Sequence, residues 1–309
     1  TALASRRHGE RRPAEAARAA GDAILYAVAL GVALGAAGSL GAGGMLALMD
    51  TPRDVAEVGR GYLAVYALAA PVLFAYFSVD AAFRASGDTR TPFLVLLGTV
   101  ALGLVLDPLL ILGLGGLPAF GVRGAALATV LTRSLAAVVG LALLRRRGLV
   151  AFGRPRPAVL AAVSRVGLPT AATGVLFSAV YVVVGRTASA LGTPALAALG
   201  LGFRVESWLY MLGVGFGAAA AAVVGQNLGA GRVDRAERAG WTMLGVASVP
   251  AVVATALSLA VPELLAGAFT RDAAVVAEAG RYLRIVAVSQ LVVCAEVVLE
   301  GALGGAGAT

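Results

Sequence analysis

The chain has 309 residues, of which 59% are hydrophobic and 14% are charged, and its mean hydropathy is +0.88. A water-soluble domain is about 45–50% apolar and about 25% charged, so the composition excludes an ordinary soluble protein. The net charge of +8 comes from 25 arginines without a single lysine. No basic face is combined with base-stacking aromatic residues, so nucleic-acid binding is not expected.

Eight apolar runs follow one another along the chain. Each is long enough to cross about 30 Å of hydrocarbon, which takes roughly 20 helical residues. The sequence therefore predicts an all-α polytopic membrane protein in contact with the lipid bilayer, and its many glycines and alanines favour close helix packing. The predicted spans are residues 22–49, 61–83, 91–118, 124–144, 166–190, 205–228, 239–266 and 282–304.

The arginines are distributed unevenly between the loops that join these spans. Sixteen of the 25 lie in the loops at 5–18, 84–90, 145–165 and 232–238, and seven lie in the alternate loops. The positive-inside rule places the first set in the cytoplasm. We expect an integral protein of a bacterial plasma membrane, acting as a monomer.

An internal repeat is present at an offset of 220 residues. The sequence GERRPAEAARAA from Gly9 aligns with GAGRVDRAERAG from Gly229. Six spans separate the two copies, so both enter the membrane in the same orientation, as in a parallel repeat. Two complete copies would need about twelve spans, so we expect a two-lobed bundle of which eight helices are present.

The segment 145–169 is rich in arginine, glycine and proline and is predicted to be the linker between the lobes. This division assigns residues 1–150 to the first lobe, with four spans, and residues 151–309 to the linker and part of the second lobe, with four more. Around residues 159–166 the linker is expected to form either a short amphipathic helix at the interface or an unstructured basic loop.

Four sequence blocks, in this order and spacing, resemble the multidrug and toxic compound extrusion (MATE) transporters. The resemblance covers essentially the whole chain and matches the third to tenth helices of that family. It implies a twelve-helix, two-lobed transporter with a central cavity, exporting organic cations or other amphipathic molecules in exchange for protons or sodium ions. The blocks are FRASGDTRTP at 83–92, LDPLLILGLG at 106–115 with GVRGAALATVLTR at 121–133, LGTPALAALGLGFRVES at 191–207, and GFGAAAAAVVGQNLGAGRVDRAERAGW at 215–241.

Ionisable residues inside the predicted spans are candidates for function, because a charge at mid-bilayer costs about 2.5–3.5 kcal/mol. Asp80 and Arg84, four residues apart, favour an ion pair on one helix face. Asp107 precedes Pro108, which favours a capped helix break, with substrate contact as the alternative. Arg186, like Arg133, can either extend to the interface or pair with a carboxylate.

The acidic residues of the second lobe are the candidates for cation coupling. Arg204 and Glu206 bracket the start of a span and favour an interface anchor or a pair, with a coupling role for Glu206 as the alternative. Glu296 and Glu300 lie one turn apart on one helix face. Two carboxylates so placed in low dielectric repel, which raises at least one pKa and suits a proton carrier.

The residues limit other kinds of chemistry. One histidine and one cysteine cannot assemble a metal cluster or a catalytic dyad with scattered carboxylates, so no catalytic residue, metal site or cofactor is predicted, and an intramembrane enzyme is disfavoured. A flippase for lipid-linked precursors is the other alternative, distinguished by a strongly cationic cavity. Aromatic residues could line a cavity for flat cations: Phe74, Tyr76, Phe77, Trp208 and Tyr210.

Overall fold

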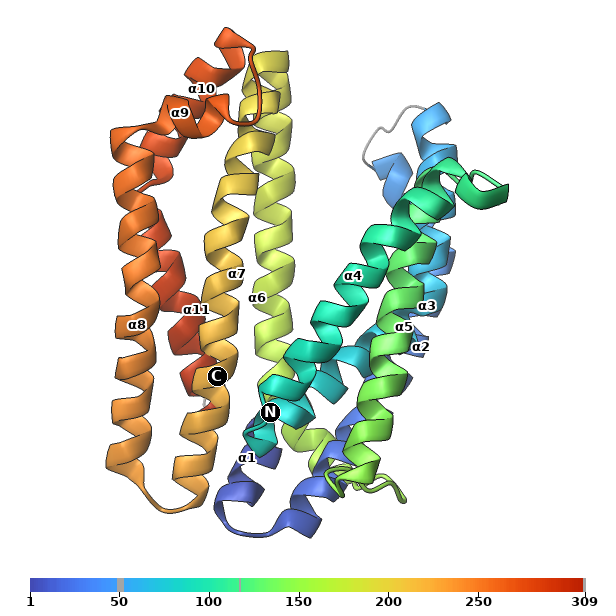
Figure 1. Cartoon of the computed structure of the whole chain (residues 1–309), viewed down its shortest axis with the longest axis vertical. Coiled ribbons are helices and arrows are strands. Elements are labelled where there is room, and N and C mark those ends of the chain that lie inside the picture. The colour runs from blue at the N-terminus through green and yellow to red at the C-terminus, as the bar shows by residue number, and fades with distance from the viewer. Residues whose placement is uncertain (49–52, 117, 308–309) are drawn as a thin grey trace. The chain divides into compact units, whose positions relative to one another are not determined.

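The computed structural model describes residues 1–48, 53–116 and 118–307 (Figure 1). Eight of the described helices are long and apolar enough to cross a membrane, as predicted. The chain divides into two compact units. Unit 1 consists of Thr1 and Arg11–Val163, and unit 2 consists of Ala2–Glu10 and Ser164–Thr309.

Unit 1 is built around α3. This helix packs against α2 and α5, and α5 also packs against α4. Its core joins Phe83 of α3 to Ile24 of α2 and Leu144 of α5, all almost fully buried. The helices are α2 (Pro13–Leu48), α3 (Arg53–Ser86), α4 (Arg90–Leu112) and α5 (Val122–Arg146).

Glycines bring these helices into backbone contact. A Cβ atom added to Gly31 of α2 would lie 2.6 Å from the Cα atom of Pro71 in α3. A Cβ atom on Gly140 of α5 would lie 2.6 Å from a methyl carbon of Val79. Neither position has room for a side chain, so the close packing expected from the composition is present.

The predicted helix break at Asp107 is wrong. Helix α4 continues through Pro108 to Leu112. It ends where Gly113 adopts a left-handed conformation (φ 71°) and donates its N–H to the carbonyl of Leu109, a conformation that glycine adopts without steric cost. The predicted span 91–118 was therefore too long, and its residue 117 lies outside the described residues.

The linker is ordered against α2. The N–H of Ala151 donates to the carbonyl of Ala17 at 2.9 Å, and Arg156 donates to Asp22 at 2.7 Å. Helix α6 (Pro157–Ala190) then begins with proline, which is favoured at a first helical position, and runs without a break. Both alternatives for residues 159–166 are therefore wrong, because this segment forms the first turns of a continuous long helix.

Unit 2 is built around α7 (Thr193–Gly229), which crosses α11 (Ser289–Ala306) with α8 (Val233–Ala260) packed against both. At the crossing, a Cβ atom on Gly301 would lie 2.6 Å from the Cα atom of Gly217. Close to it, Leu209, Ala247, Ala251, Cys294 and Val298 form a buried core. The helices α7 and α11 therefore touch through their backbones.

The predicted span 282–304 is interrupted. Helix α10 (Ala273–Val286) stops before α11 begins at Ser289, and the short α9 (Pro262–Gly267) packs beside α10. The hydroxyl of Thr255 in α8 donates to the carbonyl of Ala287 at 2.9 Å. This side-chain bond satisfies a carbonyl at the break between the two helices.

The short helix α1 (Ala2–Gly9) packs on the end of α7. The residues in contact are equivalent positions of the internal repeat, so that each helix presents the same positions to the other. A Cβ atom on Gly9 would meet the carbonyl of Gln226, and a Cβ atom on Gly229 would meet the carbonyl of Arg6. Gly9 aligns with Gly229, and Arg6 with Gln226. Ser5 lies against its own counterpart, Gly225.

Candidate functional site

In unit 1, the charge of Asp80, one of the predicted site residues, is balanced by an arginine. Asp80 forms an ion pair with Arg84 one turn along α3. Arg133 of α5 lies near Asp80 and stands over the ring of Tyr76, 4.7 Å from its centroid. Tyr76 is buried in a core with Ala136 and Ala137. These contacts assign Asp80, Arg133 and Tyr76 to the packing of α3 on α5.

Asp22 is a second neutralised acid, and the sequence analysis missed it. Its side chain is fully buried. One carboxylate oxygen accepts the hydrogen bond from Arg156, and the other is buried without a partner in the described structure, as one oxygen of Glu206 is. Asp22 and Arg156 are 134 positions apart. Asp22 is the first residue of a predicted span, and an acid at that position is usually expected to contact solvent. Its partner, Arg156, is distant in sequence and is brought to it only by the tertiary fold.

Asp107 is half-buried in α4. Within the described ranges of the chain, no arginine or histidine nitrogen lies within 4.0 Å of its carboxylate. Its assignment as a cavity or structural charge stays a prediction.

Unit 2 contains an acid of a different kind, at the centre of an aromatic cluster. Glu206 of α7 is half-buried, and one of its carboxylate oxygens is buried without a hydrogen-bond partner in the described structure. Tyr181 of α6 and Tyr282 of α10 both interact electrostatically with this carboxylate. We call Glu206, Tyr181, Phe203 and Tyr282 the Glu206 cluster.

The aromatic rings of the Glu206 cluster form a row. The rings of Tyr181 and Phe203 meet edge to face with centroids 4.8 Å apart, and those of Phe203 and Tyr282 lie 6.3 Å apart. Phe203 and Glu206 are three residues apart on α7, which places them on one helix face. The row therefore lies beside the carboxylate.

Gly202 makes room for the end of this row. A Cβ atom at this position would lie 3.3 Å from the Cζ atom of Tyr282 and closer still to other atoms of its ring. The ring consequently packs directly on the backbone of α7. Burial raises the pKa of Tyr282, and the neighbouring Glu206 carboxylate raises it further. The Tyr282 hydroxyl therefore stays protonated near neutral pH, and it forms a hydrogen bond with the Glu206 carboxylate.

This arrangement suits a monovalent cation or a proton. A carboxylate with one unpaired oxygen can take up a proton, or it can attract a cation without first breaking an internal ion pair. Aromatic faces beside it add attraction for an organic cation, worth about 2 kcal/mol when desolvated. Among the described residues, no group of three His, Cys, Asp or Glu side chains could hold a metal ion.

The other predicted site residues of unit 2 are not part of this cluster, although Arg204 adjoins Phe203 in sequence on α7. Arg204 and Arg186 are exposed, and the structure shows no ion pair between Arg204 and Glu206 over the residues it describes. Glu296 and Glu300 share one face of α11, and both are exposed. Their coupling role, and those of the two arginines, stay predictions.

The aromatic residues named from the sequence are mostly elsewhere. Phe77 and Trp208 are 64% and 71% exposed, and the ring of Trp208 faces Phe269 at 6.4 Å. Tyr210 interacts electrostatically with Tyr181 at the edge of the Glu206 cluster. Tyr181, Phe203 and Tyr282 were not among the residues predicted from the sequence. The spacing of Phe203 from Glu206 could have indicated the first ring, whereas the other two come from different helices.

Comparisons with known proteins agree on one family. The MatE family model matches residues 1–109 and 169–309. "Probable multidrug resistance protein YoeA" of Bacillus subtilis is 30% identical over 223 residues, which is 70% of this chain and 48% of that protein. A protein of Shewanella oneidensis named "FAD transporter" is 28% identical over 71% of this chain and 49% of its own length. The chain thus spans about half the length of these curated relatives.

The fold is also shared with solved structures. A MOP superfamily transporter from Pyrococcus furiosus superposes with a TM-score of 0.89 at 22% identity, covering 99% of this chain and 69% of that chain. The match supports the helical architecture and, at this identity, nothing about the ligand.

Proposed function

The chain belongs to the MatE family of multidrug efflux transporters, which are not enzymes, and we propose that its protein exports small amphipathic cations in exchange for protons or sodium ions. The observation that carries the proposal is the Glu206 cluster. Its carboxylate has an unpaired buried oxygen, it interacts with Tyr181 and Tyr282, and it forms no ion pair among the described residues. An exchanger needs such a group, which the coupling ion and the exported cation can occupy in turn.

The exchange works by differential affinity. A ligand shifts a conformational equilibrium only as far as it binds one state more tightly than the other. When a proton or sodium ion neutralises Glu206, the attraction for the organic cation falls and the cation leaves. When the coupling ion departs on the other side of the membrane, the carboxylate attracts the next cation. Coupling therefore requires that Glu206 be accessible from opposite sides in the two states.

The test uses the full-length protein in liposomes with an imposed pH or sodium gradient and a fluorescent organic cation. Glu206→Gln keeps the size of the side chain and removes its charge. We expect gradient-driven uptake to fall by at least about a hundredfold, since one charge at a desolvated site is worth about 3 kcal/mol. Glu278→Gln is the matched control, because Glu278 is a half-buried acid that already has an ion-pair partner, Arg281.

The outcomes separate the alternatives. Transport by Glu206→Gln at the wild-type rate would reject this carboxylate as the coupling site. Glu296→Gln and Glu300→Gln then test the two exposed acids of α11 as coupling residues in its place. Comparison of proton and sodium gradients identifies the coupling ion. Competition by flavin adenine dinucleotide, an anion, would contradict the cationic substrate class.

A further inference from the structure

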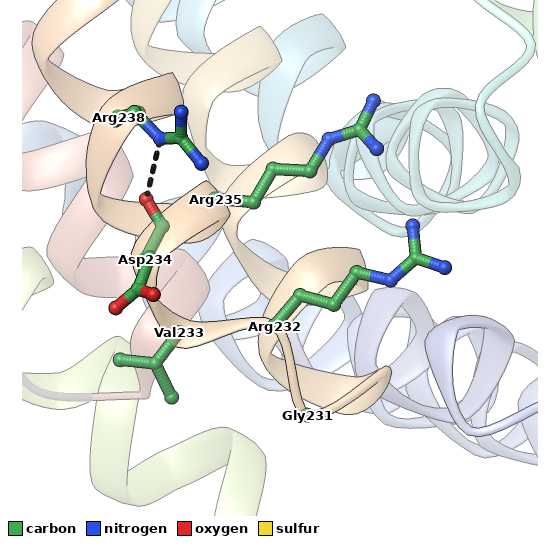
Figure 2. Close-up of a pocket in the computed structure, with 6 residues that line it drawn as sticks. All are labelled: Gly231, Arg232, Val233, Asp234, Arg235 and Arg238. Carbon is green, nitrogen blue, oxygen red and sulfur yellow. Dashed lines mark hydrogen bonds between the residues drawn. The ribbon is translucent and has the colours of Figure 1, made fainter.

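A cluster of arginines lies at the turn between α7 and α8. Helix α7 ends at Gly229, Gly231 takes a left-handed conformation (φ 71°), and α8 begins at Val233. Arg232, Arg235 and Arg238 follow at intervals of three residues, which places them on neighbouring helical turns. Together with Gly231, Val233 and Asp234 they line an open hollow of about 440 Å³, and Figure 2 shows Arg232 and Arg235 extending to the same side.

These three arginines have no ion-pair partner among the residues that the structure describes. All three are exposed, and in the described parts of the chain no carboxylate oxygen lies within 4.0 Å of their guanidinium groups. Arg238 donates only to the backbone carbonyl of Asp234, at 3.3 Å. Asp234 is the one acid lining the hollow, and its neighbour Glu237 is also exposed. The hollow therefore keeps an excess of positive charge.

At the equivalent positions of the first repeat copy, the arginines have partners within the protein. Arg12, Glu15 and Arg18 align with Arg232, Arg235 and Arg238. There, Arg12 pairs with Glu15 at 3.5 Å, and Arg18 donates to the carbonyl of Arg154 in the linker at 3.3 Å. In the first copy, the two arginines therefore have partners within the protein. In the second copy, an arginine stands in place of the acid, so that three arginines lie together.

We propose that Arg232, Arg235 and Arg238 bind the phosphate group of an anionic lipid headgroup. The hollow lies between the ends of two candidate spans, Thr193–Gly229 and Val233–Ala260, which is where lipid headgroups meet a membrane protein. Guanidinium groups form paired hydrogen bonds with phosphate oxygens. The first backbone N–H groups of α8 add donors at the same place. The ligand is the phosphodiester of a membrane lipid. The protein contacts this group on one side only, and the acyl chains of the lipid remain in the bilayer.

The experiment measures lipid retained by the purified full-length protein, using native mass spectrometry after exchange into vesicles of phosphatidylglycerol or phosphatidylcholine. We expect wild-type protein to retain phosphatidylglycerol selectively. The double variant Arg232→Gln, Arg235→Gln should reduce that retention by about thirtyfold, because each arginine near an anionic headgroup raises the affinity about fivefold and the two factors multiply. The matched control is Arg7→Gln with Arg12→Gln, which removes the same charge from arginines that pair with acids.

Four further outcomes decide the question. Equal losses in both double variants, or equal retention of the two lipids by the wild type, would overturn the proposal. Inorganic phosphate that binds the lipid-free protein as tightly as the lipid does would replace the headgroup with free phosphate as the ligand. The variant Arg232→Lys, Arg235→Lys keeps the charge but loses the paired hydrogen bonds, so it should retain less lipid than the wild type and more than the glutamine variant. If it loses as much as the glutamine variant while circular dichroism shows both folded, charge attraction is not the basis of binding.

Discussion

The two units treat their intramembrane acids differently. In unit 1, Asp22 pairs with Arg156 and Asp80 with Arg84. In unit 2, the carboxylate of Glu206 faces aromatic rings and has an unpaired buried oxygen, and over the described residues of its spans no ion pair forms. Asp22 and Asp80 therefore anchor segments of unit 1, whereas Glu206 of unit 2, like Asp107 of unit 1, forms no ion pair among the described residues.

Both units pack helices through glycines, and unit 2 has an ion pair outside its candidate spans, between Arg284 of α10 and Glu263 of α9, so the difference lies in the acids inside the spans. Unit 2 joins α7 to α11 through a glycine crossing that needs no charge. Unit 1 fixes its linker and its α3–α4 end with ion pairs. A carboxylate that maintains the fold cannot exchange its partner without weakening the protein. An acid that the fold does not require can change its ligand in each transport cycle.

The largest stability effect is expected at the linker of unit 1. Arg156→Gln would leave the buried Asp22 without its cation and should destabilise the protein by about 2–3 kcal/mol, at the lower end of the range for buried pairs because Arg156 is 40% exposed. Thermal unfolding in detergent measures the loss. Arg154→Gln, an exposed neighbour, is the control. Equal melting temperatures for the two variants would remove the structural role assigned to Asp22.

The glycine crossing of unit 2 gives the next effect. Gly301→Ala would place a methyl group onto the backbone of Gly217 and should cost about 2 kcal/mol through overpacking. Gly304→Ala, on the same helix with nothing within 4 Å, should leave stability unchanged or raise it by up to about 1 kcal/mol. If both variants behave alike, the α7–α11 contact is looser than the structure indicates, and the contrast between the units weakens.

A direct comparison of two acids gives a smaller effect. Asp80→Asn breaks the pair with Arg84 and should cost about 1 kcal/mol of stability, because the pair is partly exposed. Glu206→Gln breaks no ion pair and should change stability by less than about 0.5 kcal/mol. Melting temperatures of the two variants, measured side by side, test this ranking. A larger loss for Glu206→Gln would show that this carboxylate also maintains the fold.

The smallest effect is a pH dependence at the α3–α4 turn. Burial opposes ionisation of Asp88, but hydrogen bonds from Thr91 and Arg147 outweigh it and lower the pKa of Asp88 below its ordinary 3.8. The folded state thus binds fewer protons than the unfolded state, so this stabilisation is complete above the ordinary value and disappears as the pH falls through the folded one. Asp88→Asn should show a shallower drop in melting temperature than wild type between pH about 5 and about 3. Parallel curves would mean that Asp88 adds no pH-dependent stability.

The sequence was sufficient for the number of spans, because each apolar run is long enough to cross a bilayer by itself. It was insufficient for where helices end. At Asp107 the proline suggested a break, but the helix ends only at Gly113, where the left-handed conformation is available. At residues 287–288 nothing local marks the break, because the hydroxyl that satisfies Ala287 comes from α8.

The candidate site was predictable only in part. Glu206 stands out as an acid near the start of an apolar run, so composition identifies it as a candidate. Its surroundings come from α6, α7 and α10. Of these, α10 is distant in sequence, and it lies against α7 because position 202 has no side chain. Glu296 and Glu300 show the converse. Their spacing on one face was read correctly, but spacing does not reveal whether a face is buried.

The reciprocal contact between α1 and α7 has a consequence for how the two copies can diverge. Elsewhere each copy is free to drift, as Arg235 and Glu15 have done. Ser5, however, packs against its own counterpart, Gly225, as the same residue does in a twofold dimer of identical chains. The two positions share one volume, so a larger residue at either needs a smaller one at the other. If the gene arose by duplication of a half-length ancestor, this point preserves the ancestor's dimer contact, and its two residues have had to change together.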